Sequence, residues 1–119
     1  RQFATIHAQG VATLMLGGDH FCTYPVLRSL AGQIGRPLSL IHFDAHSDTW
    51  PARDGQVDHG TMFWRAAQEG IIDPARSIQL GIRTNNRDTL GFTVLSAEEV
   101  DRMSAEDVAA RVAEVVGDN

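Results

Sequence analysis

The stretch SLIHFDAHSDTW (residues 39–50) decides how the rest of this sequence is interpreted. An apolar run ends at Phe43, and Asp44, His46 and Asp48 follow at once. At spacings of i, i+2 and i+4, all three side chains point to one side of an extended segment. Full extension would separate the Cα atoms of Asp44 and Asp48 by roughly 13 Å, too far for both to bind one ion. We therefore expect either a curled loop that gathers the three side chains around one or two cations, or an ordinary polar turn in which Asp44 caps a helix.

The neighbouring sequence alternates between two kinds of apolar pattern. Short continuous apolar runs predict strands, and runs with helical spacing, Pro25 in a first turn and closing glycines predict helices. Ser96–Glu99 and Ser104–Asp107 fit capping boxes at two helix starts. Continuous apolar strands that alternate with helices are typical of a mainly parallel sheet with helices on both faces, a three-layer α-β-α fold of the α/β class. Strands are expected at residues 11–16, 37–43, 77–82 and 92–95, and helices at residues 1–10, 23–35, 61–70, from 96 and 104–117.

Two of the predicted strands end in similar polar clusters. GGDH (residues 17–20) follows the first strand, and DAHSD (residues 44–48) follows the second. Binding sites in open α/β sheets form at the carboxyl ends of strands, so His20 is expected to join the cluster. Mixed carboxylate and imidazole ligands suit Mn²⁺, with Zn²⁺ or Fe²⁺ as alternatives, and the lack of thiolate ligands argues against a structural zinc site.

The amino-acid composition argues against several classes of function. The 119 residues carry a net charge of −5 and contain no lysine, which argues against nucleic-acid binding. No apolar run reaches the length of a membrane span. The single cysteine, Cys22, cannot form an intramolecular disulfide, which fits a reducing cytoplasm. The partner is expected to be a small molecule rather than nucleic acid or a membrane.

Three motifs in this order resemble one enzyme family. LGGDH, HFDAHSD and DHGTMFWRA are similar to the corresponding motifs of the ureohydrolases, the family of arginases and agmatinases. The DHGTMF form, followed by GIIDPARSIQLGIR, resembles agmatinases more than arginases. The resemblance implies an arginase-like fold, a two-manganese site and attack on a guanidinium carbon by a bridging hydroxide. For an agmatinase the substrate would be agmatine, and the products would be urea and putrescine.

The same resemblance assigns roles to individual residues. It implies that His20 and Asp48 bind one manganese, that His46 binds the other, and that Asp44 bridges both. It also implies that His59 passes a proton to the leaving amine, a step that a histidine can perform near pH 7. Family members form trimers and hexamers, so we expect a homo-oligomer in the full-length protein.

The sequence also departs from the family pattern. The family completes its site with a later motif that supplies two more aspartates, and no Asp-x-Asp occurs here. We therefore expect residues 1–119 to form part of a single ureohydrolase domain with four of six ligands. Such a piece should bind metal weakly and should not turn over alone.

Several alternatives stay open. The enzyme could be an arginase, a guanidino-acid hydrolase or a one-zinc hydrolase of the deacetylase type, and the isolated piece could be an inactive metal-binding or purely structural module. His59 could merely cap the helix that follows it. His42 is expected to be a core or supporting histidine rather than a ligand, His7 a surface residue, and Trp50 a core or interface residue.

Overall fold

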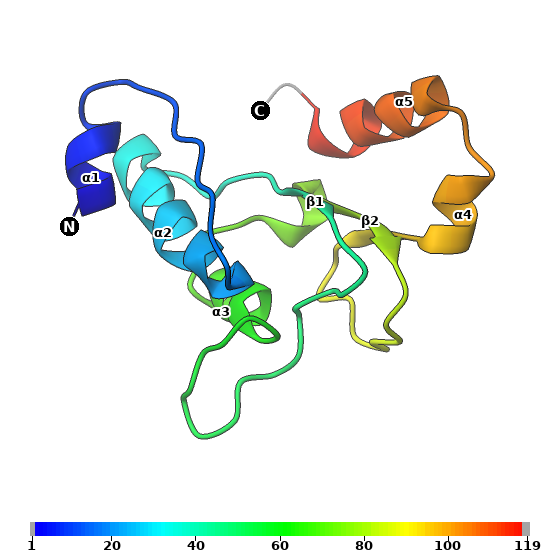
Figure 1. Cartoon of the computed structure of the whole chain (residues 1–119), viewed down its shortest axis with the longest axis horizontal. Coiled ribbons are helices and arrows are strands. Elements are labelled where there is room, and N and C mark those ends of the chain that lie inside the picture. Colours follow the sequence, from blue (N-terminus) through cyan, green and yellow to red (C-terminus); the bar gives the residue numbers. More distant parts are fainter. Residues whose placement is uncertain (1, 118–119) are drawn as a thin grey trace.

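The computed structural model describes residues 2–117 (Figure 1). Gln2–His7 form α1, and a 3₁₀ turn at His20–Cys22 (η1) leads into α2. The remaining elements are α2 (Thr23–Ile34), β1 (Ile41–Phe43), α3 (Met62–Gln68), the 3₁₀ turn η2 (Pro74–Arg76), β2 (Ile78–Ile82), β3 (Thr93–Ser96), α4 (Ala97–Asp101) and α5 (Ala105–Val116). The expected alternation of strands and helices is confirmed from α2 onward.

The three strands form one parallel sheet in the order β1-β2-β3. Ile41 pairs with Ile78, and Ile78 pairs in turn with Thr93. The predicted strand at residues 37–43 is shorter than expected, since β1 begins only at Ile41 and Leu38 makes a single isolated bridge to Ile72. The parallel α/β class is confirmed.

Helices lie on both faces of this sheet. Alternate side chains of β1 point in opposite directions, and the buried ring of His42 stacks edge to face on Phe63 of α3 at a centroid distance of 4.8 Å. On the other face, Ile41 and Phe43 share a groove of about 690 Å³ with the apolar side of α5. The three-layer arrangement is therefore confirmed, with α1, α2 and α3 on one side and α5 on the other (Figure 1).

Most buried apolar side chains lie where α2 and α3 meet the sheet. Helix α2 ends at a glycine, as predicted. Gly35 takes the left-handed conformation (φ 76°), and its N–H donates to Ala31 O. Both capping boxes, at Ser96 and Ser104, are confirmed. The core on this side contains Tyr24, Met62, Phe63, Ala66, Ile71, Ile72 and Phe92.

The predicted strand at residues 11–16 is wrong. These residues form no regular structure, and the side chains of Leu14 and Leu16 are 87% and 89% exposed. A strand needs neighbours to pair its backbone N–H and C=O groups, and within the described residues β2 pairs with β1 and β3, while no strand pairs with residues 11–16. An apolar run predicts burial only where the sheet supplies such a neighbour.

The expectation for His7 is also wrong. Its side chain is buried where α1 packs on α2, with Nδ1 3.2 Å from the hydroxyl of Ser29 and Nε2 2.9 Å from the hydroxyl of Thr13. Both ring nitrogens thus have hydrogen-bond partners, which offset the free-energy cost of burying this polar ring. Within residues 2–117, every helix falls short of the length and apolar character that a membrane span needs.

Candidate metal centre

The loop after β1 starts against the backbone of β2. The N–H of Asp44 donates to Leu80 O at 3.1 Å, which continues the strand pairing by one residue. Gly81 has a φ of 85°, and a Cβ atom on it would lie only 3.4 Å from Asp44 O. The glycine in SIQLGI therefore permits both the bend in β2 and the close approach of this loop.

The loop then curls, as the spacing of its carboxylates predicted. Asp44 Oδ1 accepts a hydrogen bond from the N–H of His46 at 2.9 Å, which stabilises a bend at residues 44–45. Asp48 has a φ of 52°, and its carbonyl accepts from the N–H of Phe63 at the start of α3. Ala45 O accepts from the backbone N–H groups of Arg83 and Thr84. Strand β2 and helix α3 thus fix this loop at both ends.

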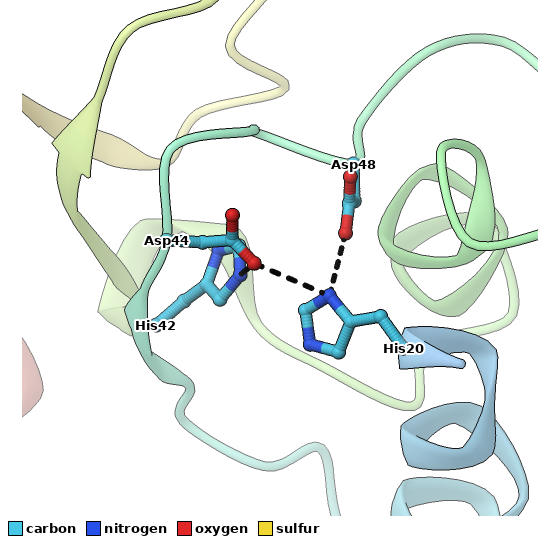
Figure 2. A group of neighbouring side chains, drawn as sticks. All are labelled: His20, His42, Asp44 and Asp48. Carbon is cyan, nitrogen blue, oxygen red and sulfur yellow. Dashed lines mark hydrogen bonds and ion pairs between the residues drawn. The ribbon is translucent and has the colours of Figure 1, made fainter. Parts of the chain in front are cut away.

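His20 reaches the loop from a separate element. Asp19 caps η1, because its Oδ1 accepts from the N–H of Phe21 at 2.7 Å. The imidazole of His20 faces the carboxylates of Asp44 and Asp48 (Figure 2). Asp19 thus acts as the N-cap of the turn that carries His20.

Four side chains converge on one point (Figure 2). One potential ligand atom from each of His20, His42, Asp44 and Asp48 lies within 4.8 Å of the other three. His20 Nδ1 is 2.7 Å from Asp48 Oδ2 and 3.4 Å from Asp44 Oδ2. The structure therefore brings together three of the four predicted ligands, and adds His42.

His46 lies on the other side of Asp44. Its Nδ1 is 3.4 Å from Asp44 Oδ1, whereas His20 and His42 approach Oδ2. The ring of His46 is 66% exposed. The two oxygens of one carboxylate thus face different histidines, an arrangement that fits a carboxylate shared between two cations.

Burial and hydrogen bonds move the pKa values of the cluster in different directions. Burial raises the pKa of the Asp48 carboxyl above its usual value, against the opposing effect of His20. Burial also tends to raise the pKa of Asp44, but the N–H of His46 and the neighbouring His42 outweigh it, so this pKa is lowered. Burial lowers the pKa of His42 to about 4, so its ring is neutral at pH 7.

The donor set fits a divalent cation. Asp48 is only 5% exposed, and its carboxylate and that of Asp44 converge on the same nitrogen of His20. Two converging carboxylates repel each other and lose hydration, and a bound cation offsets both costs. Oxygen and imidazole ligands without thiolate suit Mn²⁺ and similar ions.

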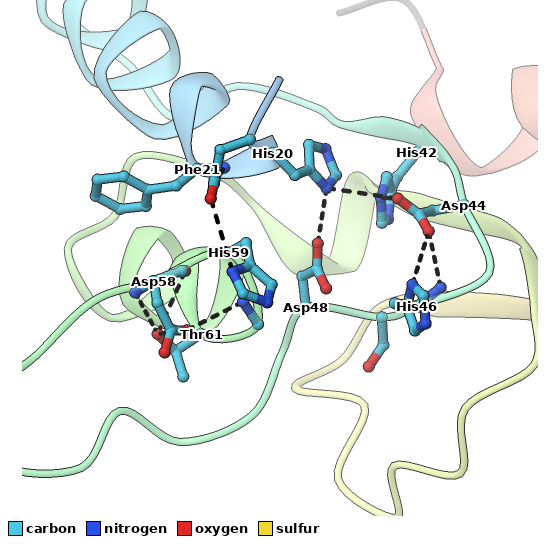
Figure 3. Close-up of polar contacts among 12 residues, drawn as sticks. His20, Phe21, His42, Asp44, His46, Asp48, Asp58, His59 and Thr61 are labelled. Atoms are coloured by element: carbon cyan, nitrogen blue, oxygen red, sulfur yellow. Dashed lines mark hydrogen bonds and ion pairs between the residues drawn. The ribbon is translucent and has the colours of Figure 1, made fainter. Parts of the chain in front are cut away.

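His59 lies at the rim of the same site (Figure 3). Its Nδ1 is 4.0 Å from Asp19 Oδ2, and its ring is largely exposed. The hydrogen bonds that shape the turn before α3 are made by Asp58, which accepts from the N–H of Gly60 and the hydroxyl of Thr61. This turn leaves the imidazole of His59 free to face the cavity.

One cavity of about 510 Å³ joins these residues. Its lining includes all five side chains singled out from the sequence: His20, Asp44, His46, Asp48 and His59. Trp50 also lines it and is half exposed, so it does not belong to the core.

The sequence analysis did not identify the buried side chain that supports the loop after β1. Gln79 of β2 is 1% exposed and hydrogen-bonds both the His42 ring and the carbonyl of Ser47. A signal was present, since Gln79 is a polar residue in the middle of the apolar run SIQLGI. A buried amide needs hydrogen-bond partners, so such a residue indicates a polar group nearby.

Comparison with known proteins places the whole chain in one group. A family model described as Arginase family matches residues 1–119. The agmatinase of Photorhabdus laumondii is 50% identical over 111 residues, which cover 93% of this chain and 36% of that protein. The chain thus spans about a third of the length of the curated relatives it matches.

Solved structures agree with the sequence comparison. A hypothetical agmatinase from Burkholderia thailandensis is 47% identical, with a TM-score of 0.93, over 98% of this chain and 37% of that chain. The proclavaminate amidino hydrolase from Streptomyces clavuligerus is 40% identical, with a TM-score of 0.83, over 96% of this chain and 41% of that chain. The fold of this chain therefore occurs within longer proteins.

Proposed function

Because the chain belongs to the Arginase family, we propose that residues 1–119 form part of a ureohydrolase that cleaves a guanidino C–N bond and releases urea. The substrate that we propose is agmatine, which would yield putrescine and urea. The relatives named agmatinase, about half identical to this chain, support this choice of substrate.

The single observation that carries the proposal is the shared cavity. Five side chains of suitable chemistry, from three separate segments, line one space of about 510 Å³. Two of them are the carboxylates of Asp44 and Asp48, and Asp19 lies beside them. Carboxylates that line a concave site attract a cationic group such as a guanidinium ion.

The cofactor that we propose is a pair of Mn²⁺ ions. His20 and Asp48 would hold one ion, His46 the other, and Asp44 both, in keeping with the way its two oxygens face different histidines. When bound, the metal pair would supply the Lewis acidity that makes water nucleophilic at neutral pH. The remaining ligands of a complete site would come from residues outside these 119.

The protein's own side chains would supply the proton transfer. Breaking a C–N bond of a guanidinium group requires a proton on the leaving amine. His59 lies at the cavity rim with Asp19 Oδ2 on its Nδ1 side, which leaves its other ring nitrogen available to the substrate. We assign His59 this role.

A second substrate class has a specific observation in its favour. The Streptomyces clavuligerus relative, 40% identical, is named for action on proclavaminate. A different guanidino compound, such as arginine or a guanidino acid, is therefore the alternative. We further propose that the full-length protein is a cytoplasmic homo-oligomer, a trimer or hexamer.

The decisive experiment measures urea release by the natural full-length protein with Mn²⁺. We expect release from agmatine, much slower release from arginine and 4-guanidinobutyrate, and none from the 119-residue chain. His59→Asn should lower kcat, whereas Arg102→Ala, an exposed change remote from the cavity, should not. A full-length protein that releases no urea from any guanidino compound would disprove the proposal.

A further inference from the structure

Two histidines, His42 and His46, compete for the role of metal ligand beside Asp44. His42 lies inside the cluster by distance, whereas His46 lies outside it. The question is whether the Nε2 atom of His42 presents a lone pair, which can bind a cation, or a hydrogen, which cannot. The contacts of Gln79 answer it.

The carbonyl of Ser47 determines how the Gln79 amide is oriented. The side-chain atom of Gln79 closest to Ser47 O is 2.6 Å away. A backbone carbonyl can only accept a hydrogen bond, so the atom facing it must be the NH₂ group. The opposite orientation would press two oxygen atoms together in a buried site.

The same NH₂ group determines the state of the His42 ring. Gln79 Nε2 lies 3.1 Å from His42 Nδ1, and an amide nitrogen has hydrogens to donate but no lone pair to offer. Nδ1 must therefore accept, and the hydrogen of the neutral imidazole lies on Nε2. The edge-to-face contact with Phe63, at 4.8 Å, holds the ring in this plane.

The hydrogen on Nε2 has one charged acceptor within reach. His42 Nε2 is 3.5 Å from Asp44 Oδ2 and makes no hydrogen bond in the part of the chain that the structure describes. A buried N–H without a partner is costly, so a small rotation of the carboxylate toward it is favourable.

We propose that Gln79 and His42 are positioning residues: Gln79 fixes His42 as an Nε2–H donor to Asp44, so that His42 orients the shared carboxylate and His46 remains the ligand on this loop. The inference rests on the proposed metal function of Asp44. It adds a series of contacts that runs from Gln79 in β2, through His42, to the carboxylate of Asp44. Partners of this kind, behind a ligand, fix its orientation and tune its affinity for metal.

The direct test is nitrogen NMR of the histidine rings in the ¹⁵N-labelled 119-residue chain at neutral pH. We expect His42, assigned by the loss of its signals in His42→Gln, to carry its hydrogen on Nε2. It should keep this hydrogen when Zn²⁺ is added as a diamagnetic probe, while the rings of His20 and His46 respond. A hydrogen on Nδ1, a mixture of tautomers as in free imidazole, or loss of the Nε2 hydrogen with Zn²⁺ would overturn the inference.

Mn²⁺ affinity of variants gives an independent readout. His42→Gln keeps an N–H near the position of Nε2 and should bind Mn²⁺ nearly as well as the unmodified chain. His42→Leu and Gln79→Leu should each lose about 10- to 100-fold, as expected for partners behind a ligand. Ser77→Ala, a buried change on the same segment that does not touch the cluster, should bind normally.

These results separate the inference from the proposed function. If His42→Gln loses Mn²⁺ as completely as Asp44→Asn, then His42 is a ligand, and the metal site survives while the inference fails. If the full-length protein releases no urea but His42 keeps its Nε2 hydrogen with metal bound, then the function fails and the inference stands.

Discussion

In residues 11–20 and in residues 38–48, an apolar run is followed by acidic and histidine side chains. The two segments nevertheless differ in the backbone contacts that they make. In the second segment, Asp44 continues the pairing of β1 with β2, and Asp48 O accepts a hydrogen bond from the N–H of Phe63 in α3. In the first, residues 11–17 form no regular structure, and His20 belongs to the short turn η1, which Asp19 caps. One half of the proposed metal site thus follows a paired strand, and the other half depends on a turn at the start of α2.

The difference shows what organises a site at a strand end. Both segments have similar side chains, but only the second contains a strand whose backbone pairs with a neighbouring strand. Ligands on rigid elements are held more closely to a productive geometry than ligands on loops.

Phe63 should have the largest effect because it touches both segments. It is 1% exposed, and its ring lies edge to face on both His42 and His20. Phe63→Ala should lower the free energy of unfolding by about 3–5 kcal/mol, the usual range for removal of a buried phenylalanine. Urea denaturation of the chain without metal measures this loss.

Phe92→Ala is the matched control. Phe92 is also a buried core phenylalanine, but it makes no ring contact with the cluster histidines. Its loss should cost similar stability and leave Mn²⁺ affinity of the folded chain unchanged. If both variants weaken Mn²⁺ binding equally, then Phe63 does not link the two segments.

Acid should destabilise the segment that contains His42. Burial lowers the pKa of this ring in the folded chain to about 4, from its ordinary value of 6.5. Between these values the unfolded state binds more protons, so this contribution is complete above pH 6.5 and is lost as the pH falls toward 4. The pKa difference corresponds to an upper value of about 3 kcal/mol.

The pH dependence is measured by denaturation of the metal-free chain between pH 7 and pH 4. His42→Gln should show a smaller loss than the unmodified chain, whereas His59→Gln, which changes an exposed ring, should show the same loss. The raised pKa of Asp48 acts in the opposite direction, so the difference between the two variants isolates His42. Equal slopes in both variants would argue against a buried neutral His42.

Binding of Mn²⁺ should stabilise the folded chain, because its proposed ligands come from both segments. A ligand that binds only the folded state stabilises it, by about 2.7 kcal/mol at a concentration 100 times its Kd. We expect Mn²⁺ to raise the Tm of the chain, and Asp44→Ala to abolish the increase, because Asp44 lies between His20 and His46. Ca²⁺ should raise the Tm less, since imidazole ligands suit transition metals better.

Two outcomes would contradict this prediction. A Tm increase that persists in Asp44→Ala would move the site away from this carboxylate. Equal increases with Mn²⁺, Zn²⁺ and Ca²⁺ would show general cation binding rather than the proposed centre. Glu98→Ala, which removes a carboxylate on exposed α4, serves as the control and should respond like the unmodified chain.

Local patterns in the sequence predicted the segments whose partners are close along the chain. The capping boxes, helix α2 and the curl between Asp44 and Asp48 depend on neighbouring residues and spacing, so the sequence contains the necessary information. The fate of residues 11–16 depends on which strands are available as neighbours, which an apolar run does not reveal. The burial of His7 and the Gln79 contacts likewise depend on residues far away in the sequence.

The smallest effect, and the clearest test of the contrast between the two segments, is expected at Leu14. Because its side chain is 87% exposed, Leu14→Ser should change the free energy of unfolding by no more than about 0.5 kcal/mol, as is usual for surface positions. Leu80→Ser in β2 replaces a side chain that is 1% exposed and should be severely destabilising. If Leu14→Ser costs as much as Leu80→Ser in urea denaturation, then residues 11–16 are buried as a strand in solution. His20 would then be held by a sheet as firmly as Asp44 is, and the difference between the two halves of the site would disappear.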